Sequence, residues 1–179
     1  MQKLVRTIIQ SVLFENKSPS LEDLKNIPVQ IPETVLPVFV TLYDGKDIVG
    51  SSGKLYPTKM SFLEELIDNT QNALQDPRFT DYRTNPEKAR NLTYRVDTFD
   101  ANSRRMLHHP DDIDTKIEGM ILICRKQNKV GVILPHMLPE TLSGEDIYHT
   151  LVKKVNLNLH DIGKWDLILY GLKTHIFQD

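Results

Sequence analysis

Apolar residues at the start of the chain recur every three or four positions, which is the period of a helix with one buried face. They are Leu4, Val5, Ile8, Ile9, Val12 and Leu13. The pattern predicts a helix over about the first 13 residues. Residues 16–37 contain four prolines, so no regular element is expected to run through them. Within them, Ser20 with Asp23 predicts one short capped turn of helix.

The centre of the chain is organised around residues 38–57. An apolar, β-branched run meets Asp44-Gly45 and is followed by a second short run that ends in Gly-Ser-Ser-Gly at 50–53. Asp-Gly between apolar runs is a strong hairpin signal, because glycine accepts the positive φ of the turn. The sequence therefore predicts a hairpin here, with residues 50–53 as a tight loop that Pro57 closes before the next helix.

Two further helices are predicted, at about 61–75 and at about 144–155. Each begins with a serine that precedes an acidic residue by three positions, which is the capping-box pattern. The pairs are Ser61 with Glu64 and Ser143 with Asp146. Apolar residues at helical spacing follow each pair, so one face of each helix is expected to be buried.

Shorter runs predict strands. Residues 92–99 alternate in polarity, which places Arg95 and Asp97 on one face. Residues 100–118 are interpreted as a polar excursion. The remaining predicted strands are a second hairpin, 119–125 with 130–134, and a final run after Trp165, 167–172, that continues to Ile176 and Phe177.

The strands come in hairpin pairs, and helices stand between the groups rather than between successive strands. That order predicts an α+β fold with mainly antiparallel sheet and flanking helices, not a doubly wound parallel sheet. We expect a single domain over residues 1–179. It is expected to contain two closely packed subdomains, roughly 1–100 plus the C-terminal strand, and 101–160.

Composition narrows the class of protein. The 179 residues are 40% hydrophobic and 26% charged, as in an ordinary globular domain. A net charge of -2 gives no basic signature for nucleic acid. No apolar run approaches the roughly 20 residues of a membrane span, and no signal-peptide pattern opens the chain. The single Cys124 excludes an internal disulfide and favours a reducing compartment. We expect a cytoplasmic protein that binds neither membrane nor nucleic acid.

Four short motifs follow one another along nearly the whole chain. They are Phe-Val-Thr-Leu at 39–42, Ile-Val-Gly-Ser-Ser-Gly at 48–53 before Leu55 and Pro57, Asp-Pro-Arg-Phe at 76–79, and Gly-Val-Ile-Leu-Pro at 131–135. In this order they resemble the AMMECR domain family, also called protein A of the AmmeMemoRadiSam system, and Trp165 matches a late tryptophan of that family. The second motif matches only loosely.

The departures from the family pattern concern chemistry. Where the family usually has an arginine and a cysteine in its central motif, this chain has Val49 and Ser51. His136 stands where glutamine usually follows Leu-Leu-Pro, and Arg95 stands where the family often has glutamate. A hydroxyl is far less acidic than a thiol and needs a base beside it to react. Position 51 of this chain therefore cannot supply a thiolate nucleophile.

The motifs define a candidate ligand site, formed by Gly50, Ser51, Ser52, Gly53, Arg78 and His136. Glycines permit close backbone approach, consecutive loop amides bind anions, and an arginine clamps them. Ser51 with His136 as its base is the candidate catalytic pair. The structural alternatives are a simple turn at 50–53, pairing of Arg78 with Asp76 or with a helix C-terminus, and a hydrogen-bonded structural His136.

His108 and His109, followed by Asp111 and Asp112, raise the question of a metal. Adjacent side chains diverge, and no third ligand has the spacing of a zinc site, so a solvated loop and no bound metal are expected. Cys124 lies in an apolar run and is expected to be a buried small residue. Nucleotide and cofactor fingerprints are absent, so no cofactor is expected.

Two functions remain open. In the first, the protein is a non-catalytic binding or accessory component. The resemblance implies a Memo-like protein and a radical SAM enzyme as partners in one modification pathway, and the candidate site implies a small anionic ligand. In the second, it is a hydrolase or transferase acting on a small molecule through Ser51 or Ser52 with His136. Loss of the family's arginine and cysteine favours the first, and the sequence leaves open whether the protein is an enzyme.

Overall fold

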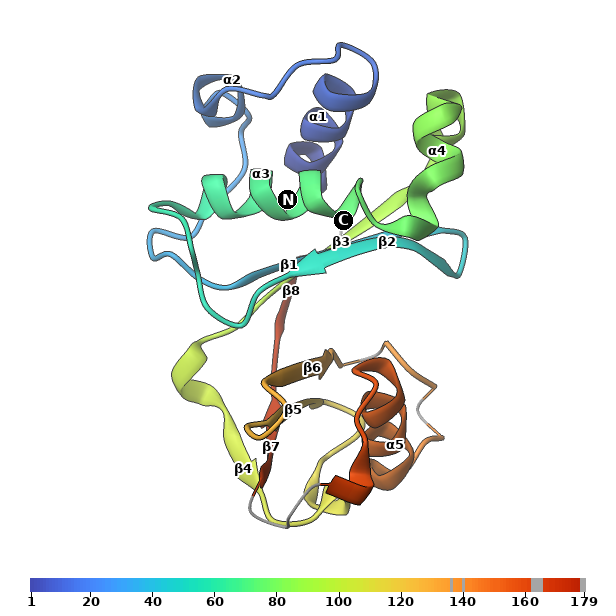
Figure 1. Cartoon of the computed structure of the whole chain (residues 1–179). Helices are drawn as coiled ribbons and strands as arrows, with labels where there is room; N and C mark the ends of the chain where they lie inside the picture. Colours follow the sequence, from blue (N-terminus) through green and yellow to red (C-terminus); the bar gives the residue numbers. More distant parts are fainter. Residues whose placement is uncertain (136, 140, 162–165, 178–179) are drawn as a thin grey trace. The chain divides into compact units, whose positions relative to one another are not determined.

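The computed structural model describes residues 1–135, 137–139, 141–161 and 166–177. The chain divides into two compact units, Met1–Ala101 with His175–Asp179 (unit 1) and Asn102–Thr174 (unit 2). Each unit contains a four-stranded antiparallel sheet accompanied by helices (Figure 1). The predicted α+β class is confirmed. No helix among the described residues is both long enough and apolar enough to cross a bilayer.

Unit 1 is built on the sheet β2-β1-β3-β8, in which all neighbours are antiparallel. Its strands are β1 (Val38–Asp44), β2 (Asp47–Gly53), β3 (Thr93–Thr98) and β8 (His175–Phe177). Its α-helices are α1 (Gln2–Leu13), α2 (Leu21–Lys25), α3 (Phe62–Ala73) and α4 (Thr80–Thr84), and two short 3-10 helices, η1 (Pro77–Phe79) and η2 (Pro86–Asn91), flank α4. α3 lies along the sheet with α1 beyond it (Figure 1).

The predicted hairpin is confirmed, and its turn follows Asp44 directly, at Gly45-Lys46, where Gly45 has a φ of 60°. The expected loop at residues 50–53 is wrong. These residues continue strand β2, with Ser51 opposite Thr41 and Gly53 opposite Phe39. The turn at Gly45 alone reverses the chain, so the second glycine-containing segment is free to pair with β1.

The helices α1, α2 and α3 begin where the sequence predicts, whereas η1, α4 and η2 were not predicted. The Ser20–Asp23 capping box is formed in full. At α3 only half of the expected box forms: the Ser61 hydroxyl accepts from the Glu64 amide at 3.3 Å, whereas the Glu64 carboxylate accepts from the Met60 amide at 3.0 Å. The predicted apolar stripe of α1 is buried through Leu4, Val5, Ile8 and Ile9. Burial of this stripe against α3 and the sheet stabilises the helix more than its intrinsic propensity does.

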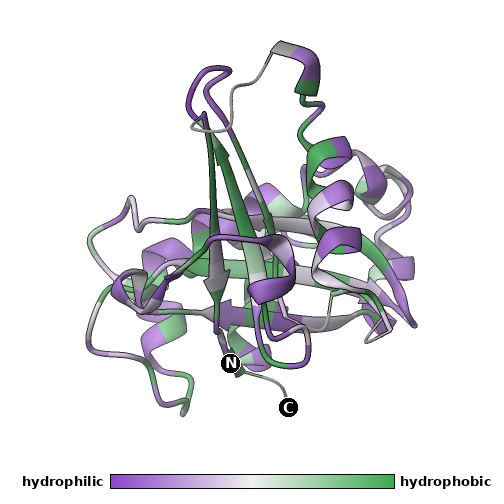
Figure 2. Cartoon of the chain, turned by 90° about the horizontal axis from the view of Figure 1, so that it is seen from below, coloured by the Kyte–Doolittle hydropathy of each residue, from purple (hydrophilic) through white to green (hydrophobic). Residues whose placement is uncertain are grey.

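Unit 2 is built on the sheet β4-β7-β5-β6. Its elements are β4 (Arg105–Leu107), β5 (Gly119–Cys124), β6 (Lys129–Ile133), β7 (Leu167–Leu172), the helix α5 (Gly144–Lys154) and the 3-10 helices η3 (Ala101–Ser103), η4 (Pro110–Asp112) and η5 (Leu159–Asp161). The predicted second hairpin is confirmed as β5 paired with β6. Figure 2 shows these strands as mostly hydrophobic and their connecting turn as hydrophilic. The Ser143–Asp146 capping box opens α5.

Two predictions in this region need correction. Residues 100–118 are not only a polar excursion, because they contain β4, which pairs with β7. The final run is not one strand: β7 lies in the sheet of unit 2, whereas β8 pairs with β3 in unit 1. Three-residue strands carry too little alternation to be read from a sequence, and the partner of a strand is not written in the strand itself.

Candidate functional site

The Asp-Pro-Arg-Phe segment lies against the outer edge of β2. This strand is the first of its sheet, so alternate backbone amides on its outer side have no strand to pair with. The Asp76 carboxylate fills one of these positions, because the Ser51 amide donates to Asp76 Oδ2 at 3.1 Å. Residues 50–53 are therefore not a nest of free amides. They form an extended strand, and the amide of Ser51 is already engaged.

Arg78 binds both Asp76 and Ser51. Its guanidinium donates from Nε to Asp76 Oδ1 at 2.9 Å and from Nη2 to Asp76 Oδ2 at 2.6 Å, a bidentate ion pair. The same Nη2 donates to Ser51 Oγ at 2.9 Å. The structure thus brings together Ser51 and Arg78, two candidate residues that are 27 positions apart. It also contains the Arg78–Asp76 pair that the sequence offered as the structural alternative.

The pair is asymmetric in exposure. The Asp76 side chain is 12% exposed and that of Arg78 is 49% exposed, so the carboxylate lies inside and the guanidinium outside. Hydrogen bonds from the Arg78 side chain are the main cause that lowers the pKa of Asp76 to about 2, despite partial burial, and the same bonds raise the pKa of Arg78. Within the described part of the chain, Nη1 of Arg78 has no hydrogen-bond partner. Two N–H groups thus remain for a ligand.

The other residues of the segment fix the position of Arg78. Asp76 caps η1 by accepting from the Arg78 amide at 3.0 Å, and Pro77 occupies the first position of that helix. Phe79 is fully buried, and its ring stacks on Tyr82 at 5.0 Å between centroids. The segment therefore anchors one side chain in the core and directs another outward.

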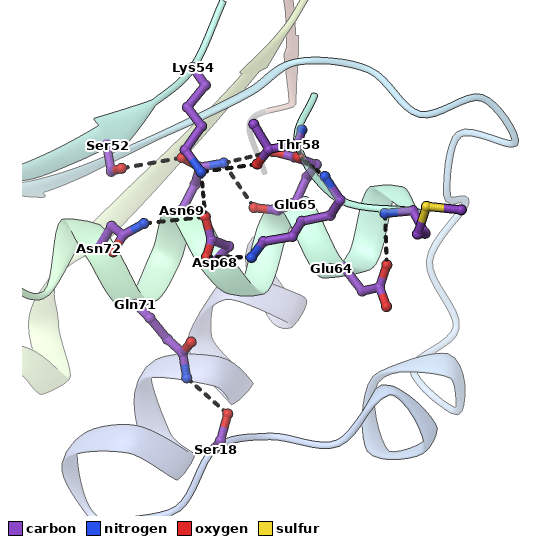
Figure 3. A network of polar contacts seen from close by, with 12 residues as sticks. Ser18, Ser52, Lys54, Thr58, Glu64, Glu65, Asp68, Asn69, Gln71 and Asn72 are labelled. Carbon is purple, nitrogen blue, oxygen red and sulfur yellow. Dashed lines mark hydrogen bonds and ion pairs between the residues drawn. The ribbon is translucent and has the colours of Figure 1, made fainter. Parts of the chain in front are cut away.

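Ser52 points to the opposite face of β2 from Ser51, as neighbours in a strand must. Its hydroxyl donates to Asn69 Oδ1 at 3.2 Å, and Asn69 Nδ2 donates to Glu65 Oε2 at 3.2 Å (Figure 3). An amide oxygen does not take up a proton at neutral pH, so Asn69 cannot activate Ser52 as a base would.

The segment that follows β2 is fastened to α3 by acidic side chains (Figure 3). The Glu65 carboxylate is fully buried and accepts from the amides of Thr58 and Lys59, the latter at 2.6 Å. The ammonium groups of Lys54 and Lys59 each lie 3.0 Å from an oxygen of Asp68. Nothing in the sequence pattern marks Glu65 as a buried residue, because an acidic side chain within a helix is usually solvated.

The two glycines of the candidate site serve packing. A Cβ at Gly50 would lie 2.5 Å from the Ala73 carbonyl oxygen, and one at Gly53 would lie 2.0 Å from the Phe39 ring. The space that a side chain would need is thus already filled by the protein. Close approach of α3 and of Phe39 to β2 requires glycine at both positions.

Two residues of the sequence analysis, His136 and Trp165, lie outside the described residues. The candidate catalytic pair Ser51–His136 therefore remains a prediction. Cys124 is fully buried in β5, as expected for a small core residue.

One cluster of potential metal ligands occurs among the described residues. His109, Asp111 and Glu145 have ligand atoms within 4.8 Å of one another, and His109 Nε2 is 3.4 Å from Glu145 Oε1. Sequence spacing did not reveal this cluster, because Glu145 comes from α5. His109 Nδ1 is already used as a cap, accepting from the Asp111 amide at 3.3 Å. His109 and Asp111 are exposed and Glu145 is half-buried, so the cluster lies at the surface, where η4 and α5 begin.

The family model AMMECR1 matches residues 2–175. The chain belongs to the AMMECR1 family. The crystal structure of the uncharacterized protein PH0010 from Pyrococcus horikoshii is similar, with a TM-score of 0.72 and 19% identity, over 99% of this chain and 89% of that one. At this identity the likeness is one of fold. No curated protein matches the chain.

This member of the AMMECR1 family has a buried valine at position 49, where the family pattern that the motif resembles usually has arginine. Val49 is 8% exposed and belongs to the apolar core of unit 1, so no cation stands there. Arg95 is buried and forms a bidentate ion pair with Asp97, at 2.7 Å for both bonds. Of Arg78 and Arg95, Arg78 has the exposed side chain, at 49% against 5% for Arg95.

Replacing Asp76 by asparagine should lower the free energy of unfolding by about 1–2 kcal/mol at neutral pH, because the charge-assisted bonds to Arg78 are lost. The folded-state pKa, about 2, lies below the ordinary 3.8. The carboxylate therefore stabilises the fold fully above about pH 4 and loses this effect as the pH falls through about 2. Urea unfolding across this range should show the two proteins converging in acid. The control Asp81→Asn removes an exposed carboxylate and should change the free energy of unfolding little. If Asp76→Asn were still less stable than the wild-type protein in acid, the loss could not be assigned to the charge of Asp76.

Proposed function

We propose that this protein is a non-catalytic accessory component that acts with a Memo-like protein and a radical SAM enzyme in a modification pathway. Its binding site is the outer edge of β2, where Arg78 and Ser51 meet. The observation that carries the proposal is the contact between the Ser51 hydroxyl and the Arg78 guanidinium at 2.9 Å.

That contact favours binding over catalysis. A nucleophilic serine needs a neighbour that takes its proton, and a guanidinium is a donor only. Ser52 has an amide oxygen as its neighbour, which is no better as a base. The hydroxyls of Ser51 and Ser52 are therefore both held in hydrogen bonds that fix their positions and do not increase their reactivity.

The site supports recognition of one carboxylate or phosphate group. Nη1 of the half-exposed Arg78 guanidinium offers N–H donors that can form charge-assisted hydrogen bonds to an oxygen of such a group. Asp76 neutralises most of the charge, so recognition rests on directed hydrogen bonds. The group is presented either by a small ligand or by an acidic side chain of a partner protein.

The test mixes the purified protein with the Memo-like protein and the radical SAM enzyme of the same organism and measures association by calorimetry. Arg78→Ala should weaken association by about tenfold or more, since a charge-assisted hydrogen bond contributes about 1.5–3 kcal/mol. The control Lys88→Ala removes an exposed cation from η2 and should leave the affinity within about twofold.

The competing function, a hydrolase or transferase using Ser51 with His136, predicts a different result. A fluorophosphonate would label Ser51 covalently in the wild-type protein, and His136→Ala would abolish the labelling. Peptide mass spectrometry distinguishes the two outcomes. Labelling of this kind would overturn the non-catalytic proposal, whereas an unlabelled protein whose association depends on Arg78 would support it.

A further inference from the structure

Unit 1 has a hollow formed by residues that take no part in the β2 site. It lies between α1 and η2 and has a volume of about 310 Å³. Ile9, Ala89 and Tyr94 line its floor, and Arg6, Phe14 and Arg90 stand around it. The volume is at the low end of the roughly 300–1,000 Å³ typical of small-molecule sites. It suits a single ring system.

The floor of the hollow is mostly apolar. Ile9, Ala89 and Tyr94 are between 1% and 3% exposed, so they belong to the core and do not move aside as surface side chains do. Burial is the main cause that raises the pKa of Tyr94, which keeps the phenol neutral. A floor of this kind favours the face of an aromatic ring over a charged group.

The rim of the hollow is cationic and aromatic. The Arg6 guanidinium lies 5.9 Å from the centroid of the Tyr94 ring, and that of Arg90 lies 4.9 Å from the centroid of Phe14. Glu87 holds Arg90 in place, with Nη2 to Oε1 at 2.9 Å. No carboxylate of the described residues forms an ion pair with Arg6. One positive charge at the rim is therefore left uncompensated.

We propose that this hollow is a second binding site, specific for a small organic anion that joins one flat unsaturated ring to a carboxylate or phosphate. The ring lies on the apolar floor and extends the arginine–aromatic contacts already present. The acidic group meets Arg6, whose charge is not paired with a carboxylate among the described residues, and Arg90 is the second cation that lines the hollow. This site is independent of the β2 edge and of the function proposed for it.

The test uses indole-3-acetate as the probe and indole-3-acetamide as its neutral counterpart of the same shape. Amide chemical shifts of the 15N-labelled protein should show saturable binding of the acid in the range of about 0.1–1 mM, with the affected amides in α1, η2 and β3. The acetamide should bind about tenfold more weakly, because it cannot form the charged contact to Arg6.

Matched variants assign the charge. Arg6→Gln should weaken binding of the acid about tenfold, whereas Lys3→Gln removes the same charge from the same helix outside the hollow and should change it by less than about twofold. Arg90→Gln should weaken binding as well, by about threefold, because Glu87 already offsets much of its charge. Arg78→Ala should leave binding unchanged.

Three results would overturn the second site. They are the absence of saturable binding up to about 10 mM, equal affinities for acid and acetamide, and equal effects of Arg6→Gln and Lys3→Gln. Loss of indole-3-acetate binding in Arg78→Ala would place the ligand at the β2 edge and would likewise overturn it. Because Arg6 and Lys3 are exposed, both variants should fold, and amide spectra of the free proteins verify this directly.

Discussion

Truncation of Phe79 to alanine should lower the free energy of unfolding by about 3–5 kcal/mol. The ring is fully buried and stacks on Tyr82, so its removal leaves a cavity that the surrounding core cannot close completely. Phe79 also ends η1, the short helix that directs Arg78 outward. The same variant should therefore weaken any association that depends on Arg78.

Equilibrium urea unfolding at neutral pH measures the effect. Phe14→Ala is the matched control: its ring is 38% exposed, and its loss should cost less than about 1 kcal/mol. Phe79→Leu keeps most of the apolar volume and should cost less than about 1.5 kcal/mol. If Phe79→Ala and Phe14→Ala were equally stable, the segment would not have the anchoring role that its burial indicates.

Replacement of Glu65 by alanine should cost about 2–4 kcal/mol, the second largest effect expected in this chain. The buried carboxylate accepts from the amides of Thr58 and Lys59 and from the Asn69 side chain. Alanine leaves these donors without their acceptor, and the loss is costly at the fully buried Asn69 side chain, which water cannot reach as a replacement partner. The segment after β2 should then detach from α3 more often.

Amide hydrogen exchange gives the local measurement. In Glu65→Ala the amides of Thr58 and Lys59 should exchange faster, while Glu65→Gln, which retains one acceptor oxygen, should show an intermediate loss of protection. Glu64→Ala is the neighbouring control. It removes the acceptor for one amide, that of Met60, and should cost less than about 1 kcal/mol. Unchanged protection at Thr58 in Glu65→Ala would contradict the fastening role.

Local signals in the sequence predicted the elements that local physics determines. The Asp44-Gly45 turn, the capping serines at 20, 61 and 143 and the apolar stripe of α1 all depend on residues a few positions apart. The same reasoning misplaced residues 50–53, because a glycine signals a turn and a close packing contact in the same way. At Gly50 the choice between a turn and a packing contact depends on where Ala73 lies, and at Gly53 it depends on the Phe39 ring.

The candidate site shows the same limit. Motif resemblance selected Ser51 and Arg78 separately, but no spacing rule connects two residues on β2 and η1. Asp76 was weighed only as a partner of Arg78, whereas it also accepts from the Ser51 amide and so joins the two motifs. Glu65 gave no signal, because two of its three partners are backbone amides, which look the same in every sequence.

The order of the strands has a consequence for how the chain is synthesised. β3 is complete at Thr98, but its outer neighbour β8 begins only at His175, after all of unit 2 has been made. At roughly 5–20 residues per second, that edge of the first sheet waits on the order of 4–15 s for its partner during translation. An unpaired edge is a template for other strands. A nascent chain of this protein therefore exposes the outer edge of β3 to chaperones and to neighbouring chains until β8 has left the ribosome.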